Sequence, residues 1–186
     1  MDAWSHKGEI MERYDLTAHL YDMRYAEEQS LKVEEALKRV KLGDESFVLD
    51  VGCGTGLLFD YVAGKASIVV GVDLSRNLLL KAKKRAEKFS NVHLVLADAD
   101  YMPFISGFFS HLFAVTVLQN MPCPEKTLTE AKRVTAENAV MVITGLKKKF
   151  GLRSFLELLS RVNLKVVGIA DGQDNLKCYV AVCMKI

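Results

Sequence analysis

The sequence predicts an α/β fold: a three-layer, doubly wound sheet of seven strands, mostly parallel, with an antiparallel last strand. Two observations predict this class. Short β-branched runs alternate with segments of helical period, which is typical of a layered sheet with right-handed crossovers. The last two runs are separated only by residues 170–175, too few for a crossover helix, so the last strand is expected to run antiparallel to its neighbour.

The chain is expected to form a single domain. It has 186 residues, of which 50% are hydrophobic, so it can bury a core without a disulfide or a metal. Over residues 27–40, apolar residues recur at i, i+3, i+4 and i+7, which is the period of a half-buried helix. Gly43 then marks the end of this helical region.

The remaining elements alternate along the chain. Residues 47–51 and 67–72 are β-branched runs followed by a glycine and an aspartate, and such runs are typical of buried parallel strands. Further strands are predicted at 92–96, 111–117, 139–144, 165–169 and 177–184. Helices are predicted at 57–63, 77–89, 152–162 and from Pro124 onward, because proline suits the first turn of a helix.

The most informative segment is a glycine-rich turn. Residues 48–57 read VLDVGCGTGL, so a strand leads directly into the turn and then into a helix. Glycines at alternate positions allow close backbone approach and leave amide groups facing a ligand at the carboxyl end of the strand. A dinucleotide site would read G-x-G-x-x-G, but here the third glycine comes one residue early and Asp50 precedes the first, which disfavours NAD.

On these residues the sequence resembles the class I S-adenosylmethionine-dependent methyltransferases, which have a seven-stranded, Rossmann-like fold. The resemblance extends from about Asp44 to Ile186 and implies S-adenosyl-L-methionine as the cofactor. It implies that Asp73 accepts hydrogen bonds from the ribose hydroxyls and that Asp98 accepts a hydrogen bond from the adenine amino group. Capping of the helix near Ser75 is the alternative for Asp73, and an exposed turn is the alternative for Asp98. The positions implied to contact the cofactor are Asp50, Gly52, Cys53, Gly54, Gly56, Asp73, Leu74, Asp98, Ala99, Thr116, Tyr21 and Arg24.

The resemblance divides the domain into an N-terminal helical lid, residues 1–43, and a Rossmann-like core, residues 44–186. Residues 14–15 and 21–25 contain Y-D pairs similar to those that form a lid over the cofactor in this family. Tyr21 and Arg24 would then meet the methionine carboxylate of the cofactor. The alternative is an amphipathic helix that docks through its tyrosines.

Gln119 and Asn120, which follow the fourth predicted strand, are the candidate catalytic residues. Their amides would orient a nucleophile, or they would cap the following helix. His111 lies at the start of the strand, away from the carboxyl edge, so we expect a hydrogen-bonded core or rim histidine rather than a general base. The sulfonium of the cofactor is already activated, so placement supplies most of the catalysis, and no metal site is predicted.

The acceptor is expected to be a macromolecule, RNA or a translation-related protein, because no insertion after the fifth strand caps the site. Lys147, Lys148 and Lys149 follow that strand and would attract an anionic substrate. A small-molecule acceptor and a non-catalytic, cofactor-binding partner subunit are the alternatives. The apolar loop Phe104 to Phe109 is expected near the edge formed by the third strand and predicts an activator protein or a homodimer. Its alternative is that Phe104 and Phe109 fold into the core.

A cytoplasmic protein without membrane contact is expected. Charged residues make up 26% of the chain, and no apolar run approaches the ~20 residues needed to cross a bilayer. Residues 1–10 lack the apolar stretch of a signal peptide. The four cysteines form no CxxC pair, which is consistent with a reducing compartment.

Overall fold

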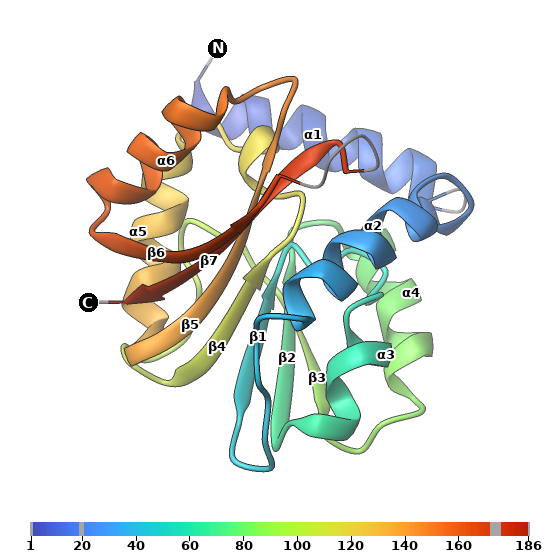
Figure 1. Cartoon of the computed structure of the whole chain (residues 1–186). Coiled ribbons are helices and arrows are strands. Elements are labelled where there is room, and N and C mark those ends of the chain that lie inside the picture. The colour runs from blue at the N-terminus through green and yellow to red at the C-terminus, as the bar shows by residue number, and fades with distance from the viewer. Residues whose placement is uncertain (1, 19–20, 172–175, 186) are drawn as a thin grey trace.

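Seven strands form one twisted sheet in the computed structural model, which describes residues 2–18, 21–171 and 176–185 (Figure 1). The sheet order is β3-β2-β1-β4-β5-β7-β6. Strands β1 to β5 run parallel, and β7 is antiparallel to both β5 and β6. The bounds are β1 Phe47–Val51, β2 Ile68–Asp73, β3 Val92–Leu96, β4 Phe109–Ala114, β5 Thr135–Leu146, β6 Leu164–Ala170 and β7 Cys178–Lys185. The predicted fold class and the antiparallel last strand are confirmed, although residues 172–175 of the short connection lie outside the described residues.

Helices cover both faces of the sheet. The helices are α1 Ala3–Thr17, α2 Tyr21–Leu37, α3 Phe59–Val62, α4 Arg76–Ala86, α5 Pro124–Val134 and α6 Leu152–Arg161, with short 3-10 turns η2 Ala63–Lys65 and η3 Leu118–Asn120. Helices α2, α3 and α4 pack on one face and α5 and α6 on the other, and each face encloses its own apolar core. Helix α1 crosses the sheet near the carboxyl ends of its central strands (Figure 1). In the part of the chain that the structure describes, no helix is long and apolar enough to cross a bilayer.

Side chains that alternate along a strand reach the two cores in turn. In β1, Leu49 lies in the core under α5 and α6, whereas Val48 lies in the core under α2 to α4. In β7, Cys178 and Cys183 likewise lie in different cores, so these free thiols face opposite sides of the sheet as their spacing predicts. The central strands are apolar on both faces because helices cover both.

Several element boundaries differ from the predictions. The strand predicted at 111–117 begins at Phe109 and ends at Ala114, because Thr116 adopts a left-handed backbone with φ 66° and cannot continue it. The helix predicted at 57–63 is shortened to α3 and the turn η2. Helix α2 begins at Tyr21, before the predicted start at residue 27, and ends at Leu37.

The aromatic loop before β4 lies at the amino edge of the sheet. The Phe108 ring stacks on Phe47 at the start of β1, with ring centroids 5.2 Å apart, and the Gly107 amide donates to the Arg133 carbonyl near the end of α5. Phe109 is fully buried and its ring meets Phe104 edge to face. The loop therefore packs against β1 and α5, and the expected position beside β3 is corrected. Its backbone leads into the start of β4 at the amino edge of the sheet, whereas β3 ends at the carboxyl edge.

Candidate active site

A cleft opens at the carboxyl edge of the sheet. It contains about 750 Å³ of space, part of which is open to solvent, and α1 forms one of its walls. The predicted site residues that line the cleft are Gly52, Gly54, Asp73, Leu74, Asp98, Ala99, Thr116 and Asn120. They come from the ends of four parallel strands, and they meet because parallel strands end at the same edge of a sheet.

The glycine turn leaves room for backbone only. A Cβ atom at Gly52, where φ is 66°, would lie 2.7 Å from the Val117 side chain, and one at Gly56 would lie 2.3 Å from the Phe59 ring. These separations are shorter than carbon atoms tolerate, so neither position accepts a side chain without movement. Gly52 lines the cleft, whereas Gly56 packs against α3 and gives the turn its shape.

Asp73 ends β2 and holds the glycine turn in place. Its Oδ2 accepts from the Gly54 amide and its Oδ1 from the Ser75 amide, each at 2.8 Å. Ser75, not Asp73, caps α4, because its hydroxyl accepts from the Leu78 amide. Burial raises the pKa of Asp73, and the backbone hydrogen bonds oppose that rise. The Leu74 amide also contributes a hydrogen bond to this carboxylate, which still has acceptor capacity for a ligand that donates hydrogen bonds.

Asp50 is a buried carboxylate near the end of β1. It is 4% exposed and has no hydrogen-bond partner among the described residues. Burial raises the pKa of Asp50 well above its usual value, and the neighbouring charge of Asp73 raises it further. It lines a small pocket beside the cleft together with Gly52 and Cys53. An isolated buried charge of this kind fits a cationic or hydrogen-bond-donating ligand group.

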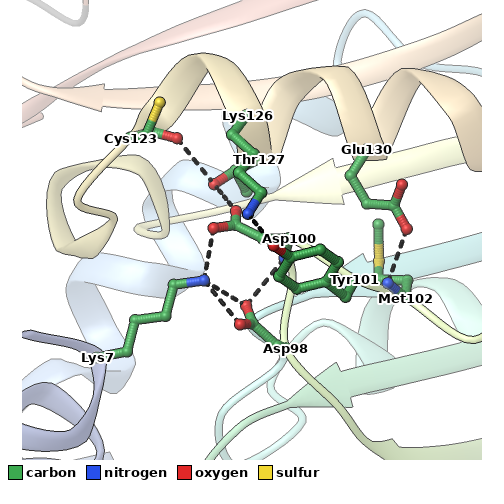
Figure 2. Close-up of polar contacts among 9 residues, drawn as sticks. All are labelled: Lys7, Asp98, Asp100, Tyr101, Met102, Cys123, Lys126, Thr127 and Glu130. Atoms are coloured by element: carbon green, nitrogen blue, oxygen red, sulfur yellow. Dashed lines mark hydrogen bonds and ion pairs between the residues drawn. The ribbon is translucent and has the colours of Figure 1, made fainter. Parts of the chain in front are cut away.

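Asp98 makes a contact that local sequence patterns did not reveal. Figure 2 shows the ammonium of Lys7, from α1, between Asp98 and Asp100. The Lys7 Nζ atom lies 2.6 and 2.7 Å from the two Asp98 oxygens and 2.5 Å from Asp100 Oδ2. Asp98 lines the cleft and is not an exposed turn residue. Lys7 is 91 residues away from Asp98 in the chain, so no motif spacing indicates the pair.

A second contact fixes the other end of α1. The Asp15 carboxylate accepts from the Ser75 hydroxyl and, at 3.2 Å, from the Asn77 amide at the start of α4. Helix α1 is thus anchored to two of the loops that form the cleft. The side chains of Tyr21 and Arg24 lie outside the described residues, so their predicted contact with the cofactor stays a prediction.

Thr116 organises the wall of the cleft after β4. Its amide donates to Thr144 Oγ1 at 2.7 Å, and its hydroxyl donates to Gln29 Oε1 at 2.9 Å. The same hydroxyl accepts from Lys32 Nζ at 3.0 Å. A left-handed backbone at a β-branched residue costs on the order of 1–3 kcal/mol and persists only where its surroundings hold it, and such strain is concentrated at functional sites.

Lys32 is buried in this wall. It is 1% exposed and pairs with Glu28 Oε1 at 2.8 Å, one turn earlier in α2. Glu28 also binds Lys177, and the two lysines lower the pKa of Glu28 despite its partial burial. The signal that could have identified Lys32 is its place on the apolar face of the helix that contains Val33 and Ala36.

Gln119 and Asn120 form the turn η3, and both side-chain amides donate to the Thr116 carbonyl, at 2.7 and 3.3 Å. The residue at the N-cap of α5 is Cys123, so the alternative in which they cap that helix is wrong. Asn120 lines the cleft and also donates to the Tyr14 hydroxyl at 3.1 Å. Gln119 Oε1 is buried and has no partner within the described part of the chain.

His111 lies near the amino edge of the sheet, away from the cleft. Its Nδ1 is 2.9 Å from Ser110 Oγ and its Nε2 is 3.1 Å from the Lys41 carbonyl. Burial lowers the pKa of His111, so the neutral ring is favoured. This is the hydrogen-bonded rim histidine that the sequence predicts.

The fold and this cleft together define a class I S-adenosylmethionine-dependent methyltransferase domain. Residues 49–143 match a family model described as "Methyltransferase domain". The chain therefore belongs to that family, whose members use S-adenosylmethionine as the methyl donor.

Two curated relatives match most of this chain at about 30% identity. The chain is 30% identical over 135 residues to an uncharacterized protein, MJ1252, of Methanocaldococcus jannaschii, covering 73% of this chain and 51% of that protein. It is 29% identical over 152 residues to a malonyl-[acyl-carrier protein] O-methyltransferase of a Marinomonas species, covering 80% and 55%. The chain thus spans about half the length of the curated relatives it matches.

A solved structure shares the fold over nearly the whole chain. It is the complex between the Haloferax volcanii Trm112 methyltransferase activator and a methyltransferase, with a TM-score of 0.81 and 14% identity. The match covers 92% of this chain and 96% of that one. At this identity the likeness shows the fold alone.

The cleft fits the cofactor on three observations. Asp50, in the small pocket beside the cleft, is a buried acceptor that suits a cationic or donating group, the Asp73 carboxylate lines the cleft, and the glycine turn allows close backbone approach. These features suit a ligand with an ammonium group at one end and ribose hydroxyls in its middle.

Proposed function

We propose that this chain transfers a methyl group from S-adenosylmethionine to a nucleophile. The observation that carries the proposal is the juxtaposition of Asp73 and a turn that accepts backbone only with Asp50, which is buried and has no hydrogen-bond partner among the described residues. When bound, S-adenosylmethionine supplies a methyl group on a positively charged sulfur. Asp50 and Asp73 hold the cofactor, and the glycine turn lets it approach the backbone.

The acceptor is proposed to enter beside Thr116 and Asn120, which line the cleft at the end of β4. Asn120 donates to the Tyr14 hydroxyl at 3.1 Å, so η3 and α1 meet at this end of the cleft. Because the leaving group is already activated, the chain contributes mainly by orienting the acceptor and excluding water. The proposed role of Thr116 and of the side-chain amides bound to its carbonyl is therefore to orient the acceptor, because they form the wall of the cleft that it would contact.

For the acceptor we propose a macromolecule, RNA or a translation-related protein. Only residues 147–151 separate β5 from α6, so no long insertion covers this side of the site, and Lys148 and Lys149 are exposed there. Lys147 binds the Asp171 carboxylate at 2.9 Å, so its charge is already paired. A small or carrier-bound acceptor is the second candidate, because the Marinomonas relative is named for a malonyl group on a carrier protein.

Incubation with methyl-labelled cofactor and separate fractions of RNA, protein and metabolites tests both proposals. We expect label in a macromolecular fraction, and we expect the double variant Lys148→Glu/Lys149→Glu to lower that labelling by about fivefold or more at low salt, because charge attraction is strongest there. Cofactor affinity should stay unchanged. Lys83→Glu/Lys84→Glu on the exposed face of α4 is the matched control.

Each other outcome has a clear meaning. Label found only in the metabolite fraction would refute the macromolecular acceptor and favour the small-molecule one. Cofactor binding without label in any fraction would favour a non-catalytic, cofactor-binding subunit.

We also propose that the Phe104–Phe109 loop docks an activator protein or a second copy of the chain. Ile105 is 71% exposed and Phe108 is 37% exposed beside it, which supports an apolar contact surface. We expect the isolated chain to self-associate in a mass measurement and Ile105→Asp to restore the monomer. Leu80→Asp, at an exposed position of α4, is the control. A monomer whose activity and solubility ignore Ile105→Asp would contradict the proposal.

A further inference from the structure

Lys7 is a buried ammonium whose hydrogen-bonding capacity is fully used. Its three N–H donors meet three carboxylate oxygens of Asp98 and Asp100, and all three residues are nearly inaccessible to solvent (Figure 2). Lys7 belongs to α1, whereas the two aspartates follow β3. A single side chain therefore joins the N-terminal helix to the loop at the Asp98 end of the cleft.

The hydrogen bonds at Asp98 leave one acceptor position for a ligand. Its Oδ1 accepts one hydrogen bond from Lys7 and one, at 2.9 Å, from the Asp100 amide. These two hydrogen bonds use both lone pairs of Oδ1. Within the described part of the chain, its Oδ2 accepts from Lys7 alone, at 2.7 Å, and Asp98 lines the cleft. The Asp100 amide holds one oxygen and Lys7 holds both, so Lys7 is the one contact that fixes Oδ2 among the described residues.

Asp100 anchors the same contact to a third element. Its Oδ1 accepts from the Thr127 hydroxyl in α5, while its Oδ2 accepts from Lys7 (Figure 2). Two carboxylates converge on one ammonium, so removing that ammonium would leave like charges facing each other in a nearly buried position. Such a pair is unfavourable, and the more mobile carboxylate would be expected to turn away.

We propose that Lys7 is a positioning residue for the cofactor: it holds the Asp98 carboxylate so that its last acceptor position meets the exocyclic amino group of adenine. The inference rests on the proposed function, because it concerns the cofactor of that reaction. It gives α1 a role at the Asp98 end of the cleft, in addition to the wall that Tyr14 forms beside Asn120.

Calorimetry with two ligands tests the inference. The first is S-adenosylhomocysteine, and the second is its analogue in which purine replaces adenine, so that only the amino group is missing. The wild-type chain should bind the first about tenfold or more tightly than the second, as expected for a hydrogen bond to a carboxylate. Lys7→Met should weaken binding of S-adenosylhomocysteine about tenfold and change binding of the analogue by less than about threefold, because the preference acts through Asp98.

The control and the remaining outcomes separate the alternatives. Lys126→Met is matched, because Lys126 lies nearby but contacts the Tyr101 hydroxyl outside the cleft, and it should change neither affinity. An equal loss for both ligands in Lys7→Met would show that Lys7 only anchors α1, and tighter binding would show that it blocks the site; either result overturns the inference. If Lys7→Met does not fold, Lys7→Gln and Lys7→Arg are compared, and the amino-group preference should fall in Lys7→Gln and persist in Lys7→Arg.

The wild-type chain separates this inference from the proposed function. Equal binding of both ligands would overturn the role of Lys7 and Asp98 while leaving cofactor binding intact. Failure to bind either ligand would overturn the proposed function, and the inference with it.

Discussion

Asp73→Ala is expected to weaken binding of S-adenosylmethionine by about 1.5–3 kcal/mol, or about 10- to 150-fold, which calorimetry would measure. The carboxylate lines the cleft and has acceptor capacity left beside its backbone hydrogen bonds, so its removal takes away hydrogen bonding to a charged group. The amides of Gly54 and Ser75 lose their partner as well, which loosens the turn itself. The wild-type chain is expected to show no binding of NAD, since its third glycine is misplaced for a dinucleotide.

Two further variants make this result specific. Asp44→Ala removes an exposed carboxylate outside the cleft and should leave the affinity unchanged. Asp73→Asn keeps one oxygen acceptor, so its loss should fall between the wild type and Asp73→Ala. Unchanged affinity in Asp73→Ala, or tight binding of NAD to the wild type, would contradict the assignment of this site.

Asp50→Asn is expected to shift stability and affinity in opposite directions. The cofactor-free chain should gain about 1 kcal/mol or more of unfolding free energy at pH 7, because the variant no longer buries an uncompensated charge. Cofactor affinity should fall by about 2–5 kcal/mol, the usual cost of removing one member of a buried charged pair. Denaturant unfolding and calorimetry on the same samples measure the two effects.

The pH dependence of stability has a definite sign. The pKa of Asp50 in the folded chain lies above its usual value of 3.8, and the pKa of Asp73 is raised as well. Between the usual value and the raised one, the folded chain binds more protons than the unfolded chain, so these groups lower the unfolding free energy as pH rises from about 4 through the folded pKa. Asp50→Asn should flatten this slope. Asp44→Asn, at an exposed position, should not change it.

A less stable Asp50→Asn chain at pH 7, with the wild-type pH slope intact, would mean that the charge of Asp50 is already compensated. In that case the carboxylate would be part of the internal framework of the turn. Removal of the Asp50 carboxylate would then weaken cofactor binding only by altering the backbone of the glycine turn.

Local sequence patterns were sufficient for the order of the elements and for the glycine turn. The alternation of strand and helix reflects side-chain periodicity within each segment, and the turn reflects the conformational freedom of Gly52 and Gly54. Asp50 and Asp73 could be placed near the carboxyl edge of the sheet because parallel strands bring their carboxyl ends to one edge. These properties depend on residues close together in the chain, so they were predictable without the fold.

The contacts that complete the site were decided by tertiary structure. Lys7 and Asp98 are 91 residues apart, and Lys32 and Thr116 are 84 apart, so neither pair has a spacing that a local pattern could reveal. The left-handed backbone of Thr116, which ends β4 early, is unfavourable in isolation and is held only by partners from α2 and β5. The sequence by itself determined which of the predicted polar residues follow strands that end at the carboxyl edge of the sheet. The packing of α1 and α2 near that edge determined that Lys7 and Lys32 bind residues of the loops that follow β3 and β4. Only the folded chain brings these partners together, and the energy of a buried charge depends on such neighbours.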